Sequence, residues 1–146
     1  MDNSLSITVV IITLNRAEWL KDALVSLTKQ SRPPDEVVVV DNGSTDDTEE
    51  IVLSFRDRLP LKYVLETVRG IPFARNTGVR NATGDIVAFI DDDSVADENW
   101  LKYIEIPFIK DPYIGAVGGE KTHYPMGEGY IETFFMKNMK PKSRSK

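Results

Sequence analysis

Three consecutive aspartates, Asp91, Asp92 and Asp93, follow an apolar run and are the strongest candidates for chemistry in the chain. In an extended strand, alternate residues point to the same side about 6.6 Å apart, so we expect Asp91 and Asp93 to face together and Asp92 to face away. Two carboxylates at that distance repel by about 2.5 kcal/mol at an effective dielectric constant of about 20. A divalent cation would reverse the sign of this interaction. Carboxylate oxygens suit Mg²⁺ or Mn²⁺, which also bind the phosphates of nucleotides, so the pattern predicts a metal site at Asp91 and Asp93.

Other polar residues follow the ends of two further apolar runs. Thr13 and Asn15 come after the first run, and Asp41 comes after the second. In an open parallel sheet these positions share the edge at which ligands bind, so we expect them to lie beside the three aspartates. There, Asp41 would accept a hydrogen bond from a nucleobase N–H or a ribose hydroxyl, and Arg75 would pair with an anionic ligand. The alternative is that the aspartates serve turns and helix caps and that Arg75 is a solvated charge.

The hydrophobic pattern predicts strands that alternate with helices. Apolar runs predict strands over residues 7–14, 37–40, 62–65, 86–90 and 114–117, and the nearly continuous β-branched run over 7–14 suits a strand buried on both faces. Apolar residues at helical spacing predict helices over residues 16–29, 73–82 and about 99–109, and a further helix capped within residues 44–46. This order predicts an α/β protein, Rossmann-like, with three α/β/α layers around a mainly parallel sheet.

A few single residues within these elements also carry expectations. Gly78 lies inside a predicted helix, where glycine costs about 1 kcal/mol relative to alanine, and close packing on the sheet would explain it. Trp19 and Trp100 lie on apolar helical stripes and are expected in the core. His123 is the one histidine, and a packing role is favoured over that of a third metal ligand because one residue forms no spacing pattern.

Composition limits the class of protein. A chain of 146 residues predicts a single domain over residues 1–146, with an α/β core over about 1–119 and a C-terminal extension over 120–146. The 41% hydrophobic content is enough for a core, and a net charge of −5 argues against nucleic-acid binding across the surface. The chain has no cysteine, which excludes disulfides, thiolate metal sites and cysteine nucleophiles.

The ends of the chain bear on localisation. No apolar run approaches the roughly 20 residues of a membrane span, and the first residues lack the positive region of a secretory signal, so we expect a cytoplasmic protein. Apolar residues within 130–136 precede a basic tail over 137–146. This segment could lie on an anionic membrane as a peripheral contact. The favoured alternative is a helix that packs on the sheet or on a missing second half, followed by a disordered tail.

Four segments resemble the family 2 glycosyltransferases, which have the glycosyltransferase A-type fold. They are VVIITLNRAEWL, VVVVDNGSTDDT, RGIPFARNTGVRNATGDIVAFIDDDS and IGAVGG, in the family's order within about residues 6–119. The resemblance implies transfer of a sugar from a nucleotide-sugar, commonly a UDP-sugar, with inversion at the anomeric carbon. It further implies that Thr13 and Asn15 border the nucleotide, that Asp41 pairs with the base and that Arg75 lies close to the nucleotide.

The resemblance also assigns roles to the aspartates. Asp91 would contact the ribose or the metal, Asp93 would ligate the metal, and Asp92 would belong to the nucleotide-binding set. The metal, Mn²⁺ or Mg²⁺, would neutralise the charge that grows on the diphosphate leaving group.

One departure from the family pattern concerns the catalytic base, which normally lies in a second half well after the aspartates. Here only residues 94–146 follow, and Glu120, Glu128 and Glu132 match no motif, so no base is named. The chain is similar to the nucleotide-binding half of a longer enzyme, incomplete at its C-terminus, whether truncated or naturally short. We expect it to bind a donor and to turn over poorly alone. The acceptor, saccharide or lipid-linked, and the oligomeric state stay open.

Other classes of function match the same residues less well. Asp91 to Val95 fits the nucleophile motif of haloacid dehalogenase-like phosphotransferases, although that motif belongs on a first strand and here follows the fourth. A dinucleotide site is disfavoured because residues 13–16 contain no glycine. A Ca²⁺ loop fails because Ala96 and Lys102 replace the required glycine and glutamate. A non-catalytic nucleotide-sugar-binding fragment remains an alternative.

Overall fold

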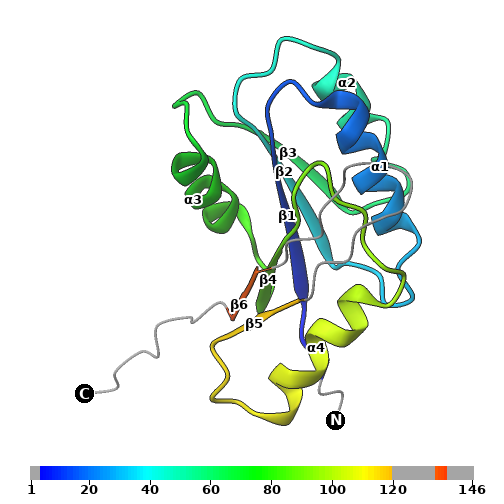
Figure 1. The fold of residues 1–146 in the computed structure, drawn as a ribbon, viewed down its shortest axis with the longest axis vertical. Helices are drawn as coiled ribbons and strands as arrows, with labels where there is room; N and C mark the ends of the chain where they lie inside the picture. Colours follow the sequence, from blue (N-terminus) through cyan, green and yellow to red (C-terminus); the bar gives the residue numbers. More distant parts are fainter. Residues whose placement is uncertain (1–3, 120–133, 138–146) are drawn as a thin grey trace.

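A computed structural model describes residues 4–119 and 134–137 (Figure 1). Each strand and helix predicted within residues 7–117 is present, with ends that shift by a few residues. In chain order the elements are β1 (Ile7–Thr13), α1 (Ala17–Thr28), β2 (Glu36–Asp41), α2 (Thr48–Leu53), β3 (Leu61–Leu65), α3 (Ile71–Asn81), β4 (Ile86–Phe89), α4 (Trp100–Lys110), β5 (Ala116–Gly118) and β6 (Phe134–Lys137).

The strands form one sheet in the order β3-β2-β1-β4-β6-β5. The first four strands in this order pair in parallel, and β6 runs antiparallel to both β4 and β5. The expectation of a mainly parallel sheet is therefore confirmed. In the register of β1 and β2, Thr13 lies opposite Asp41, so both residues end their strands at the same edge.

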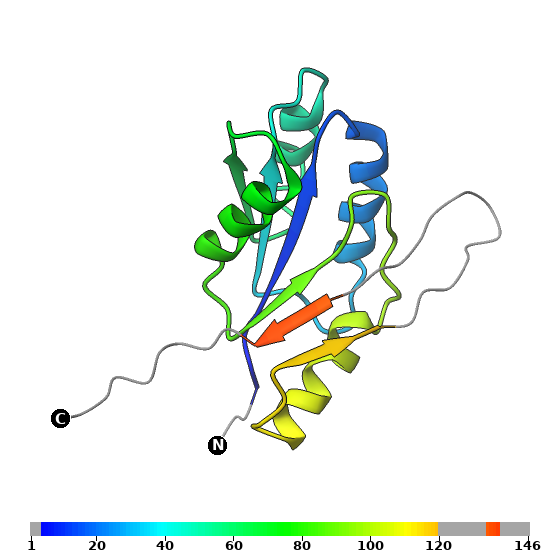
Figure 2. The same cartoon turned by 60° about the vertical axis from the view of Figure 1, so that its left-hand side comes forward.

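Helices cover both faces of the sheet, as the apolar strands require. Val9 and Ile11 of β1 pack in one apolar cluster with residues of α1, α2 and α4, whereas Val10 packs on the opposite face with Ala74 of α3. Figure 2 shows α3 on one side of the sheet and α1 with α2 on the other. Since successive strand residues point to opposite faces, an unbroken apolar run fills both cores at once. The three-layer α/β/α arrangement is confirmed.

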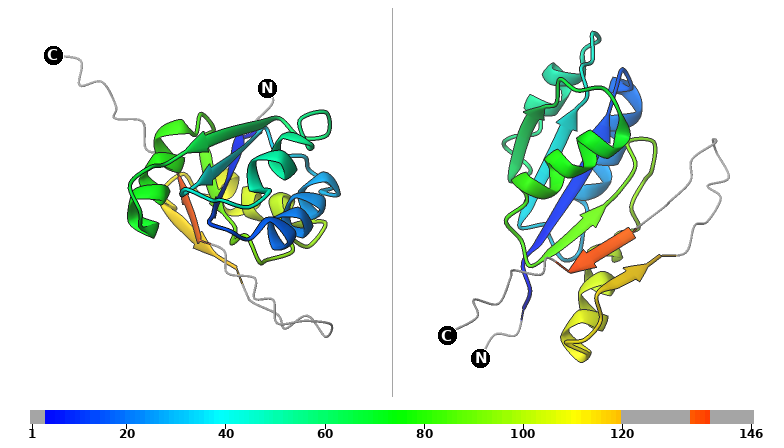
Figure 3. Two further views of the ribbon diagram at one scale, coloured as in Figure 1. Left: turned by 90° about the horizontal axis from the view of Figure 1, so that it is seen from above. Right: turned by 90° about the vertical axis from the view of Figure 1, so that its left-hand side faces the viewer.

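Strand β6 corrects one expectation. A helix was favoured for the apolar residues 130–136, but residues 134–137 form a strand that inserts between β4 and β5 (Figure 3). The free edge of β4 offers unpaired backbone groups, and a short segment that contains two phenylalanines satisfies them better as a strand. His123, Glu120, Glu128, Glu132 and the tail beyond residue 137 lie outside the described residues.

Two further expectations had opposite outcomes. Trp100 is buried, as predicted, but Trp19 is 51% exposed, so its placement in the core is wrong. Trp19 is one residue, about 100° of helical rotation, away from Leu20 on the buried stripe of α1.

Gly78 of α3 does pack closely on the sheet, because a Cβ atom there would lie 2.4 Å from Val10 Cγ1. No helix within the described ranges combines the length and apolarity needed to cross a bilayer.

Candidate functional site

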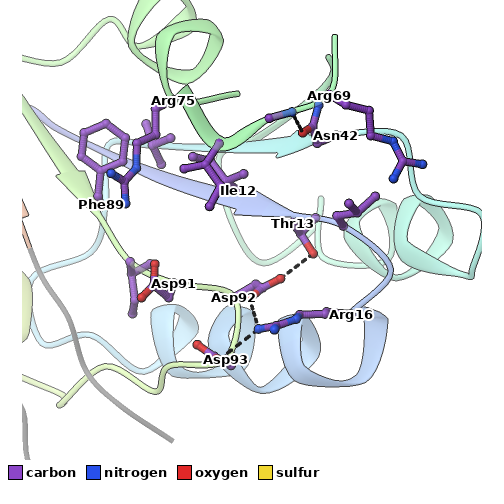
Figure 4. A pocket seen from close by; sticks show the side chains of 15 residues that line it. Ile12, Thr13, Arg16, Asn42, Arg69, Arg75, Phe89, Asp91, Asp92 and Asp93 are labelled. Atoms are coloured by element: carbon purple, nitrogen blue, oxygen red, sulfur yellow. Dashed lines mark hydrogen bonds and ion pairs between the residues drawn. The ribbon is translucent and has the colours of Figure 1, made fainter. Parts of the chain in front are cut away.

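A cavity of about 490 Å³ opens at the carboxyl ends of β1 and β4, beside the start of α3 (Figure 4). Its walls come from segments far apart in sequence: β1 and the turn after it, the loop between β3 and α3, α3 itself and the segment after β4. Six charged side chains line it, namely Arg16, Arg69, Arg75, Asp91, Asp92 and Asp93. Thr13 and Arg75 therefore lie together with the three aspartates, whereas Asn15 and Asp41, expected at the same place, do not line the cavity.

The aspartates do not alternate as an extended strand would. Strand β4 ends at Phe89 and the chain turns at Asp92 and Asp93, so the two-residue period stops before the cluster. Asp92 and Asp93 both point to Arg16, while Asp91 lies apart from them near Phe89 (Figure 4). The expectation that Asp92 faces away from an Asp91–Asp93 pair is thus wrong.

Asp92 is the buried member of the cluster, with 7% of its surface exposed. Its Oδ2 atom accepts a 2.9 Å hydrogen bond from Thr13 Oγ1, and its Oδ1 atom lies 3.3 Å from Arg16 Nη1. Burial raises the pKa of Asp92, and the Thr13 hydrogen bond and the Arg16 charge offset part of that rise. Thr13 and Arg16 therefore hold a carboxylate that its surroundings would otherwise disfavour.

Asp41 lies at the same sheet edge but does not line the cavity. Its Oδ1 atom accepts hydrogen bonds from the backbone N–H groups of Gly43 (3.1 Å) and Ser44 (2.8 Å), and its Oδ2 atom accepts one from Tyr63 at 2.8 Å. Burial and the hydrogen bond to Asp41 raise the pKa of the Tyr63 hydroxyl. In this structure Asp41 shapes the loop after β2, and its pairing with a nucleobase stays a prediction.

Asn15 also serves the loops around the cavity. It adopts a left-handed φ of 54°, which asparagine tolerates better than most residues. Its backbone N–H donates to Ser44 Oγ at 2.8 Å, and its Oδ1 atom accepts a 2.7 Å hydrogen bond from the N–H of Thr45. Asn15 thus ties the turn after β1 to the loop after β2, and its contact with a nucleotide stays a prediction.

Asn42 was not singled out from the sequence, yet it lines the cavity and fixes one wall. Its Nδ2 atom donates to the carbonyls of Glu66 (2.9 Å) and Val68 (2.8 Å), and its Oδ1 atom accepts from Gly70 N–H at 2.9 Å. These bonds set the loop that brings Arg69 to the cavity. The available signal was the place of Asn42 directly after Asp41 at the end of a strand.

Arg16, Arg69 and Gly70 were missed as well, although they stand in the segments that carry the family resemblance. Side chains that reach a cavity from a turn or a helix start follow no hydrophobic period. Only their position directly before the start of a helix could have marked them.

The donor set suits a divalent cation together with an anion. Asp91 and Asp93 offer hard oxygen ligands, and the Arg16 guanidinium already places a positive charge against Asp92 and Asp93. No cluster of three or more histidine, cysteine, aspartate or glutamate residues that could hold a metal ion occurs in the described part of the chain. In typical Mg²⁺ sites the protein supplies one or two carboxylates, and phosphate oxygens of the ligand fill other coordination positions. The guanidinium groups of Arg69 and Arg75 suit such phosphates.

Comparison with known proteins decides the family. A model of the family described as Glycosyl transferase family 2 matches residues 8–144. The chain belongs to this family. Its similarity to the poly-beta-1,6-N-acetyl-D-glucosamine synthase of Staphylococcus epidermidis reaches 33% identity over 114 residues, which cover 77% of this chain and 28% of that protein.

Solved structures of family 2 relatives share the fold. The mannosyltransferase PcManGT from Pyrobaculum calidifontis, in complex with GDP-Man and Mn²⁺, is 31% identical with a TM-score of 0.78, over 92% of this chain and 45% of that one. Residues 1–349 of S. aureus TarS, in complex with UDP-GlcNAc, are 30% identical with a TM-score of 0.68, over 83% and 38%. This family 2 chain therefore has the glycosyltransferase A-type fold, and it spans less than half the length of each of these relatives.

Proposed function

We propose that this chain is the donor-binding part of a family 2 glycosyltransferase that transfers a sugar from a UDP-sugar to an acceptor, with inversion and with a divalent metal. The observation that carries the proposal is the cavity at the sheet edge, where three arginines and three aspartates meet. Guanidinium groups bind phosphate oxygens, and the aspartates hold the cation that a diphosphate needs. Relatives that bind UDP-GlcNAc or GDP-Man in solved structures support this choice of ligand.

The roles of the residues follow from their positions. Arg69 and Arg75 pair with phosphate oxygens from the loop before α3 and from α3. Thr13 keeps Asp92 in place, which fixes the turn that presents Asp91 and Asp93. Asp91 and Asp93 would hold Mn²⁺ or Mg²⁺, and the bound ion would neutralise negative charge on the diphosphate leaving group. Asp41 and Asn15 hold the loop after β2 in place. In the proposal, Asp41 pairs with the base and Asn15 borders the nucleotide.

Calorimetric titration with UDP and with GDP, each with and without Mn²⁺, tests the proposal. We expect the chain to bind UDP in the presence of Mn²⁺ and to bind GDP more weakly under the same conditions. It should lose UDP binding when Mn²⁺ is removed. Asp93→Ala should abolish the binding, and Asp41→Ala should weaken it. Equal UDP affinity with and without Mn²⁺ would contradict the metal roles of Asp91 and Asp93.

Turnover is a separate part of the proposal. We expect the isolated chain to bind donor and to transfer sugar poorly, because among its described residues the carboxylates that line the cavity are Asp91, Asp92 and Asp93, which serve the metal and the nucleotide and leave no base for an acceptor. A robust rate of transfer to an acceptor would refute this expectation. Trapping of an aspartyl-phosphate on Asp91 would instead support the phosphotransferase alternative, which family membership disfavours.

The proposal also covers localisation. The chain is placed in the cytoplasm, and peripheral membrane contact through the basic tail is the less favoured alternative. The tail over residues 137–146 carries five basic residues. Co-sedimentation with anionic liposomes at low salt tests the contact, since electrostatic attraction to the membrane is strongest there. An absence of binding would rule the membrane contact out.

A further inference from the structure

Arg16 places one cationic group between two carboxylates of the cavity. It stands at the N-cap position of α1, and its Nη1 atom lies 3.3 Å from Asp92 Oδ1 and 3.1 Å from Asp93 Oδ2. The same guanidinium lines the cavity (Figure 4). A single nitrogen therefore screens the repulsion between adjacent acids.

The two carboxylates are held unequally. The Asp92 side chain is 9% exposed and is also bonded to Thr13, whereas the Asp93 side chain is 34% exposed. Arg16 itself is 52% exposed. An ion pair as open to water as Arg16–Asp93 contributes little stability and exchanges partners readily. Asp92 is thus a fixed partner of Arg16, and Asp93 is a replaceable one.

We infer that Arg16 is a positioning residue that occupies the cation position on Asp93 in the metal-free protein and releases Asp93 when a divalent ion binds. This inference rests on the proposed function, since it concerns the metal that Asp93 would ligate. The released guanidinium remains at the cavity wall, where a diphosphate offers it new anionic oxygens. Arg16 therefore opposes binding of the metal alone and favours joint binding of metal and diphosphate.

The exchange of Arg16 for the metal on Asp93 couples the binding of metal to the binding of diphosphate, and each ligand must then change the affinity for the other by the same factor. In the wild-type chain, UDP should raise the affinity for Mn²⁺, and Mn²⁺ should raise the affinity for UDP by the same factor. Without Arg16 the metal no longer competes with an internal cation, so the factor should fall.

The test is a titration of the whole chain with Mn²⁺ alone, in which the free ion is followed by its electron paramagnetic resonance signal. Arg16→Gln should bind Mn²⁺ roughly three- to tenfold more tightly than the wild type, the scale expected for loss of one exposed ion pair and one nearby charge. Arg75→Gln is the matched control, because it removes the same charge from the same cavity without removing the contact to Asp93. It should tighten Mn²⁺ binding by about twofold or less.

Rescue and UDP coupling complete the design. Arg16→Lys, which keeps the charge, should restore most of the wild-type Mn²⁺ affinity, and the Mn²⁺–UDP coupling factor should be smaller in Arg16→Gln than in the wild type. Equal or weaker Mn²⁺ binding in Arg16→Gln, an equal effect of Arg75→Gln, or no Mn²⁺ binding in any variant would overturn the inference. Failure of UDP to bind the wild type in saturating Mn²⁺ would instead refute the proposed function, and the titration with Mn²⁺ alone would still decide the role of Arg16.

Discussion

The hydroxyl of Thr13 donates a 2.9 Å hydrogen bond to Asp92, and this bond joins the end of β1 to the turn after β4 across 79 residues of sequence. Both side chains are buried. The parallel pairing of β1 with β4 brings the two strand ends together, and the hydrogen bond then fixes how the aspartate turn is presented. The shape of the candidate site therefore depends on a contact between its two main segments.

Thr13→Val should show how much the hydrogen bond between Thr13 and Asp92 contributes to stability. Valine has nearly the shape of threonine but cannot donate, so the buried Asp92 carboxylate loses a partner. We expect the free energy of unfolding to fall by about 1–3 kcal/mol. Urea denaturation measures the change, and Thr13→Ser, which retains the hydroxyl, is the control. A valine variant as stable as the wild type would show that Asp92 does not need Thr13.

Asn42→Ala should loosen the loop between β3 and α3. The substitution removes the acceptor of the Gly70 N–H and the donor to Glu66 and Val68, at a net cost of about 1–3 kcal/mol. Hydrogen exchange at the Gly70 amide should accelerate, and UDP affinity should drop because Arg69 is less well placed. Asn81→Ala, on α3 and outside the cavity, is the comparison variant. If both variants changed Gly70 exchange equally, Asn42 would have no special role.

Gly78→Ala should destabilise the protein even though alanine favours helices by about 1 kcal/mol. The new methyl group would lie 2.4 Å from Val10 Cγ1, and Val10 is a stiff, fully buried side chain. We expect a net loss of about 1–3 kcal/mol in thermal or urea unfolding. The double variant Gly78→Ala with Val10→Ala should lose less stability than the sum of the losses in the two single variants, since the second change makes room for the first. Strict additivity would argue against the contact.

Tyr63→Phe should have an effect that depends on pH in a defined direction. Near neutral pH, loss of the hydrogen bond to Asp41 should cost about 1 kcal/mol. Burial and Asp41 raise the Tyr63 pKa in the folded protein, so above about pH 10 the unfolded chain loses a proton that the folded chain retains. The stability advantage of the wild type is thus present below pH 10 and shrinks as the pH rises further. Urea midpoints at pH 7, 9 and 10.5 measure it, and a difference that stays constant over this range would contradict the linkage.

The fold could be predicted from the sequence because nearly continuous apolar runs, such as residues 37–40, are typical of strands buried in a parallel sheet. The shared edge of Thr13, Asp41 and the aspartates followed from that topology. The orientation of Asp92 did not, because it depends on the point at which β4 ends, and this is set by pairing with β1. Arg16 and Asn42 reach the cavity through contacts between distant segments, which no local spacing encodes.

Strand β6 illustrates the same limit at the scale of an element. A four-residue segment with three apolar residues carries too little pattern to distinguish a strand from part of a helix. Its state is decided by the backbone groups of β4 and β5, with which it pairs. The expectation for Trp19 is wrong by one position around α1, because Leu20 takes the buried position and Trp19 is exposed.

The most direct test of the central claim is to locate the bound metal and nucleotide by NMR. With UDP present, small amounts of paramagnetic Mn²⁺ should broaden the amide signals of residues 91–93 most strongly, then those of residues 13–16 and 69–71. Asp35 and Glu36, at the opposite edge of the sheet, should keep their signal intensity. Broadening centred elsewhere, or spread evenly over the chain, would contradict the assignment of this cavity as the donor site.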